Sequence, residues 1–250
     1  MKKTGIYERN QIMFLLSNHG GEGMQVEDAK VLEENFEDYI MNLEKLFGGE
    51  KQKNGKRIIL SGAFPDCDEI YKNSLLEAVL VYSREIIKNG YTLVFGAHPT
   101  FQEPIFKIGE SYASDIKESI EMHMDRKYIG GYDLQELQKK CTLVLADGLQ
   151  EMRENMISKK QSELLICLGG KIKEDKSQQG VDREVELAKA AGIPVVLVGT
   201  VGGRSGSYAF ERIQTKEWSD LNVLGEEFNE KLFYHVNHRL MIRQLLDRIK

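Results

Sequence analysis

Short apolar runs that alternate with amphipathic helical segments are the feature of this chain that most limits its fold. The runs lie at residues 58–62, 91–96, 142–146, 164–168 and 194–198, with 119–122 as a weaker candidate. Helical spacing of apolar residues predicts helices at 70–88, 104–111, 134–140, 149–159 and 181–191, and one C-terminal helix at about 226–249. Apolar strands separated by such helices are typical of a parallel sheet covered on both faces. We therefore expect residues 57–250 to form a Rossmann-like, doubly wound α/β domain with a parallel sheet.

Residues 1–56 differ from this pattern and precede its first strand. Apolar residues recur at helical spacing within residues 31–41, and glycines at 20–23 follow an earlier apolar segment at 12–16. A polar stretch, residues 48–56, leads into the first strand. We expect an N-terminal helical extension and linker over residues 1–56.

Composition excludes several classes of protein. The chain has 250 residues and a net charge of −5, which argues against the basic footprint of a nucleic-acid-binding protein. It contains no apolar run of the ~18 residues that a transmembrane helix needs. Its N-terminus is too polar for a secretory signal, and three cysteines, an odd number, are typical of buried thiols in a reducing compartment. We expect a cytoplasmic protein that meets no membrane and no nucleic acid. No metal-ligand spacing is present among the cysteines and histidines, so we expect no metal and no cofactor.

Small residues end four of the predicted strands. Ligands of doubly wound sheets bind beyond the carboxyl ends of the strands, so these turns form a candidate site. The last turn, residues 199–206, is expected to be a flexible glycine-rich loop. The candidate ligand-binding residues are Ser61, Gly62, Gly96, His98, Gly169, Gly170, Gly180, Thr200, Gly202, Gly203 and Arg204.

Three charged side chains accompany these glycines. Paired glycines before a helix let backbone N–H groups approach a phosphate, and the arginine fork of Arg204 suits the same group. Arg153 lies on the helix before the glycine strand, and Glu184 lies in the first turn of the helix after it. A carboxylate there can bind a ribose hydroxyl or stabilise the cation formed when an N-glycosidic bond breaks. Glu186 is a rival for the role of Glu184, and each charged residue has the plain alternative of a surface or structural role.

These motifs resemble the SLOG superfamily, which contains the LOG cytokinin-activating phosphoribohydrolases and the DprA/Smf proteins. LOG enzymes carry an arginine-bearing helix, a strand, and then Pro-Gly-Gly-x-Gly-Thr-x-x-Glu. Gly169 and Gly170 match the paired glycines, and residues 180–184 match Gly-Thr-x-x-Glu with Val181 in place of Thr. The resemblance covers about residues 57–210 and implies that Arg153 and Glu184 stand where the family has its catalytic pair. It also implies phosphate and base contacts at the turns after residues 60 and 95.

The chain departs from the LOG motif at three points. Leu168 replaces the motif proline, Glu154 replaces the lysine after the arginine, and residues 171–179 separate the glycines. In these points the pattern is similar to divergent SLOG clusters associated with bacterial conflict systems, whose members include binders of nucleotide signals derived from NAD. The resemblance therefore implies nucleotide binding more directly than LOG-type catalysis.

Three functional hypotheses remain open. The first is a protein that binds a nucleotide or ADP-ribose-like small molecule at the rim of the sheet and hydrolyses an N-glycosidic bond, with Arg153 and Glu184 as the catalytic residues. The second is a non-catalytic nucleotide sensor of a bacterial defence or stress system. The third, an interaction protein with a degenerate site, is the least favoured, because four rim turns keep small residues. LOG-like proteins are commonly dimers, so the resemblance also implies a homodimer.

Overall fold

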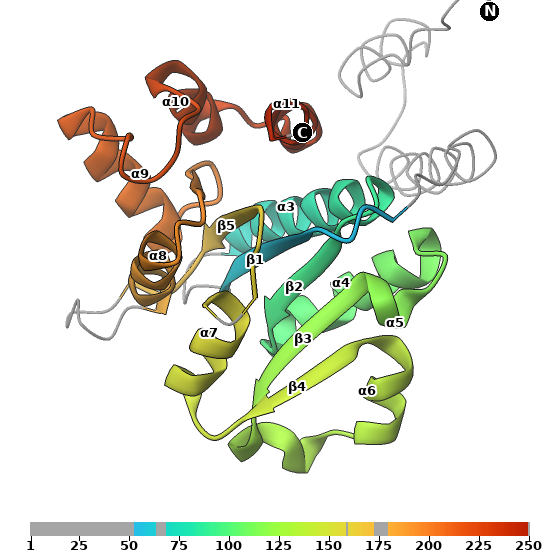
Figure 1. The fold of residues 1–250 in the computed structure, drawn as a ribbon. Helices are drawn as coiled ribbons and strands as arrows, with labels where there is room; N and C mark the ends of the chain where they lie inside the picture. Colours follow the sequence, from blue (N-terminus) through green and yellow to red (C-terminus); the bar gives the residue numbers. More distant parts are fainter. Residues whose placement is uncertain (1–52, 64–68, 159, 173–179, 250) are drawn as a thin grey trace, which may run out of the picture. The chain divides into compact units, whose positions relative to one another are not determined.

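The structure, a computed structural model, describes residues 53–63, 69–158, 160–172 and 180–249 (Figure 1). The predicted helical extension lies outside these residues except for 53–56. Six strands form one sheet, in the order β4-β3-β2-β1-β5-β6, and every neighbouring pair is parallel. The strands are β1 (Arg57–Ala63), β2 (Thr92–Gly96), β3 (Ile120–Asp125), β4 (Thr142–Ala146), β5 (Leu164–Gly169) and β6 (Val195–Val198). The predicted Rossmann-like α/β fold is confirmed.

Helices cover both faces of the sheet, as the all-apolar strands require (Figure 1). On one face Leu60 and Phe95 pack in a core cluster with α3 (Glu69–Lys88), α4 (Pro99–Tyr112), α10 (Glu226–Tyr234) and α11 (His238–Arg248). On the other face Ile59 and Val94 pack in a second cluster with α7 (Leu149–Ile157), α8 (Gly180–Ala190) and α9 (Gly203–Thr215). Three short elements flank β3 and β4: α5 (Ile116–Ser119), the 3₁₀ helix η1 (Arg126–Gly131) and α6 (Leu134–Lys140).

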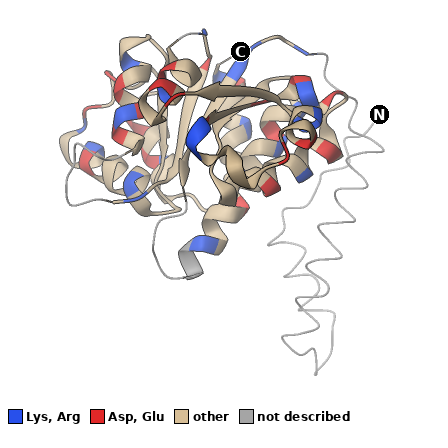
Figure 2. Ribbon diagram, turned by 90° about the horizontal axis from the view of Figure 1, so that it is seen from below, with Lys and Arg blue, Asp and Glu red and all other residues tan. Residues whose placement is uncertain are grey.

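Charged residues are concentrated on the helices and connections. Figure 2 shows Lys and Arg mixed with Asp and Glu along the helices, whereas the strands are almost free of charge. Within the described part of the chain, no helix is both long enough and apolar enough to cross a membrane.

The side on which the chain adds new strands to the sheet changes between β1 and β5. From β1 the chain adds β2, β3 and β4 on one side, then returns to place β5 and β6 on the other. Doubly wound sheets bind ligands in the crevice that such a reversal leaves at the carboxyl ends of the two strands. Ser61 and Gly62 of β1, Gly169 at the end of β5 and Gly170 directly after it lie at this switch point.

The predicted start of α4 was wrong by five residues. This segment has two prolines, Pro99 and Pro104, and each is acceptable at the first position of a helix. The structure uses Pro99, because the His98 side chain accepts a hydrogen bond from the Thr100 N–H and Phe101 is buried in the core. Pro104 then lies inside the helix.

Two predictions in the C-terminal third were also wrong. Residues 203–206 are not a loop but the first turn of α9. The glycines in this turn led to the prediction of a loop. The single helix at 226–249 is two helices, α10 and α11. The helix is interrupted at Asn237, because the side chain of this residue accepts a hydrogen bond from the Leu240 N–H and so caps a new helix.

Candidate functional site

The floor of the site is the contact between β1 and β5. A side chain on Gly62 would lie 1.8 Å from the carbonyl oxygen of Leu168, so this position accepts only glycine. Beyond it, the Gly170 N–H donates to the Ala63 carbonyl at 2.9 Å. The two strands therefore stay together to their ends, and the paired glycines begin where the sheet stops.

The paired glycines form a turn that only glycine adopts easily. Gly169 has φ +65° and Gly170 has φ +90°, both in the left-handed region. A Cβ on Gly170 would lie 2.5 Å from Val181 in the first turn of α8. The turn is therefore packed directly against the start of α8, where unpaired N–H groups favour an anion.

Glu184 lies at the centre of the site and is held by one partner on each oxygen. The Ser61 hydroxyl donates to Oε2, and Arg153 Nε donates to Oε1 at 3.3 Å. The three side chains come from β1, α7 and α8, and the Glu184 side chain is 12% exposed. The structure thus brings together three of the predicted site residues, although Ser61 lies 123 positions and Arg153 lies 31 positions before Glu184 in the sequence.

Burial raises the pKa of Glu184 above its ordinary value. The hydrogen bond from Ser61 and the charge of Arg153 oppose this rise without cancelling it. The neighbouring Cys167, which pairs with Ser61 across β1 and β5, is fully buried. Burial raises the pKa of its thiol and Glu184 adds to the rise, so Cys167 stays a neutral thiol.

Arg153 also borders the start of α8. A Cβ on Gly180 would lie 3.2 Å from one terminal nitrogen of the Arg153 guanidinium. The guanidinium therefore lies beside the helix N-terminus, and both carry positive charge. A phosphate placed there would meet backbone N–H groups and an arginine fork together.

Gly96 and His98 lie one strand away: Gly96 ends β2, and His98 follows it. A Cβ on Gly96 would be 3.3 Å from the Met152 methyl group, so α7 packs closely over this turn. His98 caps α4, and its Nδ1 lies 2.6 Å from the Thr100 hydroxyl. Burial lowers the pKa of His98, and the charge of nearby Lys171 lowers it further. The His98 ring is therefore neutral near pH 7 and lies on the same rim as Lys171.

Arg204 is not the flexible cation that the sequence suggested. It lies in α9, is 6% exposed, and binds Asp182 through Nε at 2.7 Å and a terminal nitrogen at 2.6 Å. Another terminal nitrogen donates to Glu211 at 2.7 Å, and the guanidinium stacks on Tyr208. These carboxylates raise the pKa of Arg204 above its ordinary value. Its side chain therefore joins α8 to α9.

The backbone of the 199–203 turn completes the rim. The Arg204 N–H donates to the Gly170 carbonyl at 2.8 Å, and a Cβ on Gly203 would lie 2.6 Å from the same oxygen. The predicted positions Gly202 and Gly203 have φ +68° and +64°. Thr200 follows β6, and its buried hydroxyl has no hydrogen-bond partner among the residues that the structure describes.

Two residues near the site were not among the predicted ones. Asp182 holds Arg204, and its signal was an acidic residue in the first turn of α8, two positions before Glu184. Lys171 follows the paired glycines, and a lysine directly after a candidate phosphate turn was the available signal. Among the residues that the structure describes, no group of three or more His, Cys, Asp or Glu side chains could hold a metal ion.

Comparisons with known proteins agree with the fold of this chain. A family model described as STALD, the Sir2- and TIR-associating SLOG family, matches residues 46–234, which is more than half of the chain. The crystal structure of TM1055, a structural genomics target, is similar at 16% identity with a TM-score of 0.51. The match covers 77% of this chain and 99% of TM1055, and it shows the fold alone. A comparison with curated proteins gives no match.

Proposed function

This chain belongs to the Sir2- and TIR-associating SLOG family, and from that premise we propose that it binds a nucleotide or an ADP-ribose-like ligand. The observation that carries the proposal is Glu184, buried at the switch point of the sheet and held between Ser61 and Arg153. Placing a carboxylate away from water is costly, and perturbed acids of this kind gather at functional sites.

Each part of the site has a role in this proposal. The Gly169–Gly170 turn, the start of α8 and the Arg153 guanidinium hold a phosphate. The ionised Glu184 accepts a hydrogen bond from a ribose hydroxyl, and the protonated Glu184 donates one to it. The raised pKa of Glu184 brings the protonated form closer to neutral pH. Arg204 supports the turn through its N–H and through Asp182, and it does not hold the phosphate directly.

A sensor is the form of this function that we favour. The family description names association with Sir2 and TIR proteins, which supports a module that reports a ligand to other domains. A homodimer, a cytoplasmic location and a place in bacterial defence belong to the same proposal and rest on the resemblance to SLOG proteins.

Hydrolysis of an N-glycosidic bond is the second candidate, favoured by the direct pairing of Arg153 with Glu184. In this reaction the bond between the ribosyl carbon and the base breaks, water adds to that carbon, a proton from the water passes to the departing base, and an ionised Glu184 stabilises the developing cation. Arg153 would orient the phosphate. The raised pKa of Glu184 weighs against this role, because a neutral acid stabilises a cation poorly.

One experiment separates these functions. Purified protein is incubated with AMP, other nucleoside monophosphates, NAD and ADP-ribose, and free base is measured by chromatography while melting temperature is recorded. Stabilisation without base release supports the sensor. Base release that is lost in Glu184→Gln supports the hydrolase. The matched control is Glu186→Gln, because Glu186 lies on the same helix, pairs with its neighbour Arg183 at 3.0 Å, and has a side chain that is 65% exposed. If none of these nucleotides at millimolar concentration changes the melting temperature, both functions are contradicted.

A further inference from the structure

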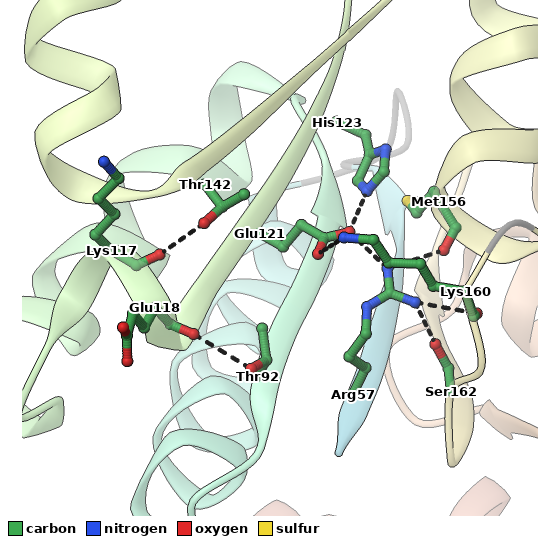
Figure 3. Close-up of polar contacts among 10 residues, drawn as sticks. All are labelled: Arg57, Thr92, Lys117, Glu118, Glu121, His123, Thr142, Met156, Lys160 and Ser162. Atoms are coloured by element: carbon green, nitrogen blue, oxygen red, sulfur yellow. Dashed lines mark hydrogen bonds and ion pairs between the residues drawn. The ribbon is translucent and has the colours of Figure 1, made fainter. Parts of the chain in front are cut away.

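A buried charge cluster lies beneath α7, outside the site described above (Figure 3). Its centre is Glu121 of β3, which is 5% exposed. Three side chains contact its carboxylate: Arg57 at 2.6 Å, His123 at 2.7 Å and Lys160 at 2.9 Å. Burial alone would raise the pKa of Glu121, but hydrogen bonds from His123 and Lys160 and the charge of Arg57 outweigh it and lower the pKa to about 2. Glu121 is therefore a permanent anion at neutral pH.

Arg57 connects this anion to the end of α7. From the first position of β1, its guanidinium reaches Glu121 on β3, two strands away in the sheet. The same guanidinium donates to the carbonyl oxygen of Met156 at 3.3 Å and to that of Lys160 at 3.1 Å. It also donates to the Ser162 hydroxyl at 2.9 Å. A cation bound to the last carbonyls of a helix stabilises that end.

The same helix carries one half of the central ion pair. Met152 and Met156 face the sheet, whereas Arg153 reaches Glu184 on α8 at 3.3 Å. At its start, α7 has Gly148 in the cap position, and this glycine offers no side-chain cap. Two exposed hydrogen bonds hold the first turn: Glu151 accepts from the Asp147 N–H at 2.7 Å, and Gln150 accepts from Arg183 of α8 at 3.3 Å. The C-terminal end is held from within the core, because the buried Arg57 guanidinium donates to the Met156 carbonyl. A small shift of α7 would lengthen the contact between Arg153 and Glu184.

We infer that Arg57 and Glu121 are positioning residues, which hold α7 where Arg153 meets Glu184, and the consequence for ligand binding rests on the proposed function. Burying charges costs desolvation, and an apolar cluster of similar volume is often as stable. What the charged cluster adds is a set of directional hydrogen bonds, which an apolar cluster lacks. A guanidinium held by one carboxylate and two carbonyls fixes the end of α7 in one place, which packing of methionines alone does not do.

The direct test is the titration of Glu184 in the ligand-free protein. The Glu184 carboxyl is followed by NMR of ¹³C-labelled glutamate, with Glu184→Gln used to assign its signal. In Glu121→Gln, α7 loosens, Arg153 withdraws, and the pKa of Glu184 rises by about one unit. Loss of the Glu121 charge by itself would lower the pKa of Glu184, so the sign distinguishes repositioning from simple charge removal.

The controls isolate the path through Arg153. Glu85→Gln is the matched variant, because Glu85 is a buried carboxylate held by Arg243 on the opposite face of the sheet, and it should leave the pKa of Glu184 unchanged. In an Arg153→Gln background, Glu121→Gln should produce no further rise. Ser162→Ala removes one acceptor of Arg57 without changing any charge, and it should raise the pKa of Glu184 by a smaller amount.

Binding of ADP-ribose gives a second readout. Glu121→Gln should weaken it about tenfold, and Glu85→Gln should not change it. An unchanged or lowered pKa of Glu184 in Glu121→Gln overturns the inference, as does a further rise in the Arg153→Gln background. If Glu121→Gln does not fold, Ser162→Ala decides, and an unchanged pKa there overturns it. If the wild-type protein binds no nucleotide, the proposed function fails, while the Glu184 titration still decides this inference.

Discussion

At the scale of single residues, Ser61 makes a contact that its position in the sequence does not reveal. A serine before a glycine at the end of a strand was predicted to contact the ligand. In the structure its hydroxyl donates to Glu184, and Ser61 is 2% exposed. A direct contact between Ser61 and the ligand stays a prediction, while the hydrogen bond to Glu184 is an observed feature of the site.

The Ser61→Ala variant tests this hydrogen bond. It should raise the pKa of Glu184 further, because a donor that favours the ionised carboxylate is lost. The free energy of unfolding should fall by about 1 kcal/mol. Ser119→Ala removes another buried hydroxyl, bound to the Asp115 carbonyl at 2.7 Å, and serves as control. NMR titration and urea unfolding measure the two effects. An unchanged pKa of Glu184 in Ser61→Ala would contradict this role.

At the scale of elements, the packing of α9 against the paired glycines makes Gly203 a sensitive position. Gly203 has φ +64°, and a Cβ there would lie 2.6 Å from the Gly170 carbonyl oxygen. Gly192 has a similar φ of +69°, and an added Cβ there would meet no other part of the described chain within 4 Å, so Gly192→Ala isolates the cost of the backbone conformation. Gly203→Ala should therefore destabilise the protein by about 2 kcal/mol more than Gly192→Ala, measured by urea unfolding. Equal losses would show that the turn is loosely packed.

Elements with a simple pattern were predictable from the sequence, and those that depend on distant partners were not. Strand β4 and helix α6 have the predicted bounds, because apolar continuity and helical spacing define them. Strand β3 extends to Asp125, three residues beyond the prediction. Glu121 is buried there because it pairs with His123, with Arg57 of β1 and with Lys160 after α7, and no local pattern reveals these partners.

The same distinction applies to the site. The pairing of Arg153 with Glu184 followed from a motif, whose spacing reflects how helix, strand and helix pack in sequence. The partners of Arg204 could not be predicted from a motif, because Asp182 and Glu211 come together only when α8 packs on α9. A glycine-rich segment also conceals a helix start, since glycine is a weak helix former that is nonetheless required at Gly203 and Gly206 by close backbone contacts.

At the scale of the whole molecule, Glu121 links β3, β1 and the connection after α7, and it makes stability depend on pH. The pKa of Glu121 is about 2 in the folded protein, below the ordinary value of 4.5. Its contribution is therefore complete above about pH 4.5 and is lost as the pH falls toward about 2. Between pH 7 and pH 3, the stability difference between the wild type and Glu121→Gln should shrink by about 2 kcal/mol. Urea unfolding of both proteins at the two pH values measures this, and a constant difference would contradict it.

The central claim, that a nucleotide binds between the paired glycines, Arg153 and Glu184, is tested most directly by the melting temperature with ADP-ribose. If ADP-ribose is in hundredfold excess over its Kd, the wild type should melt roughly 5–10 °C higher. Arg153→Gln should lose most of this increase, because the guanidinium borders the start of α8 where the phosphate binds. An equal increase in both proteins would place the ligand elsewhere, and the absence of an increase with ADP-ribose, AMP and NAD alike would contradict the account.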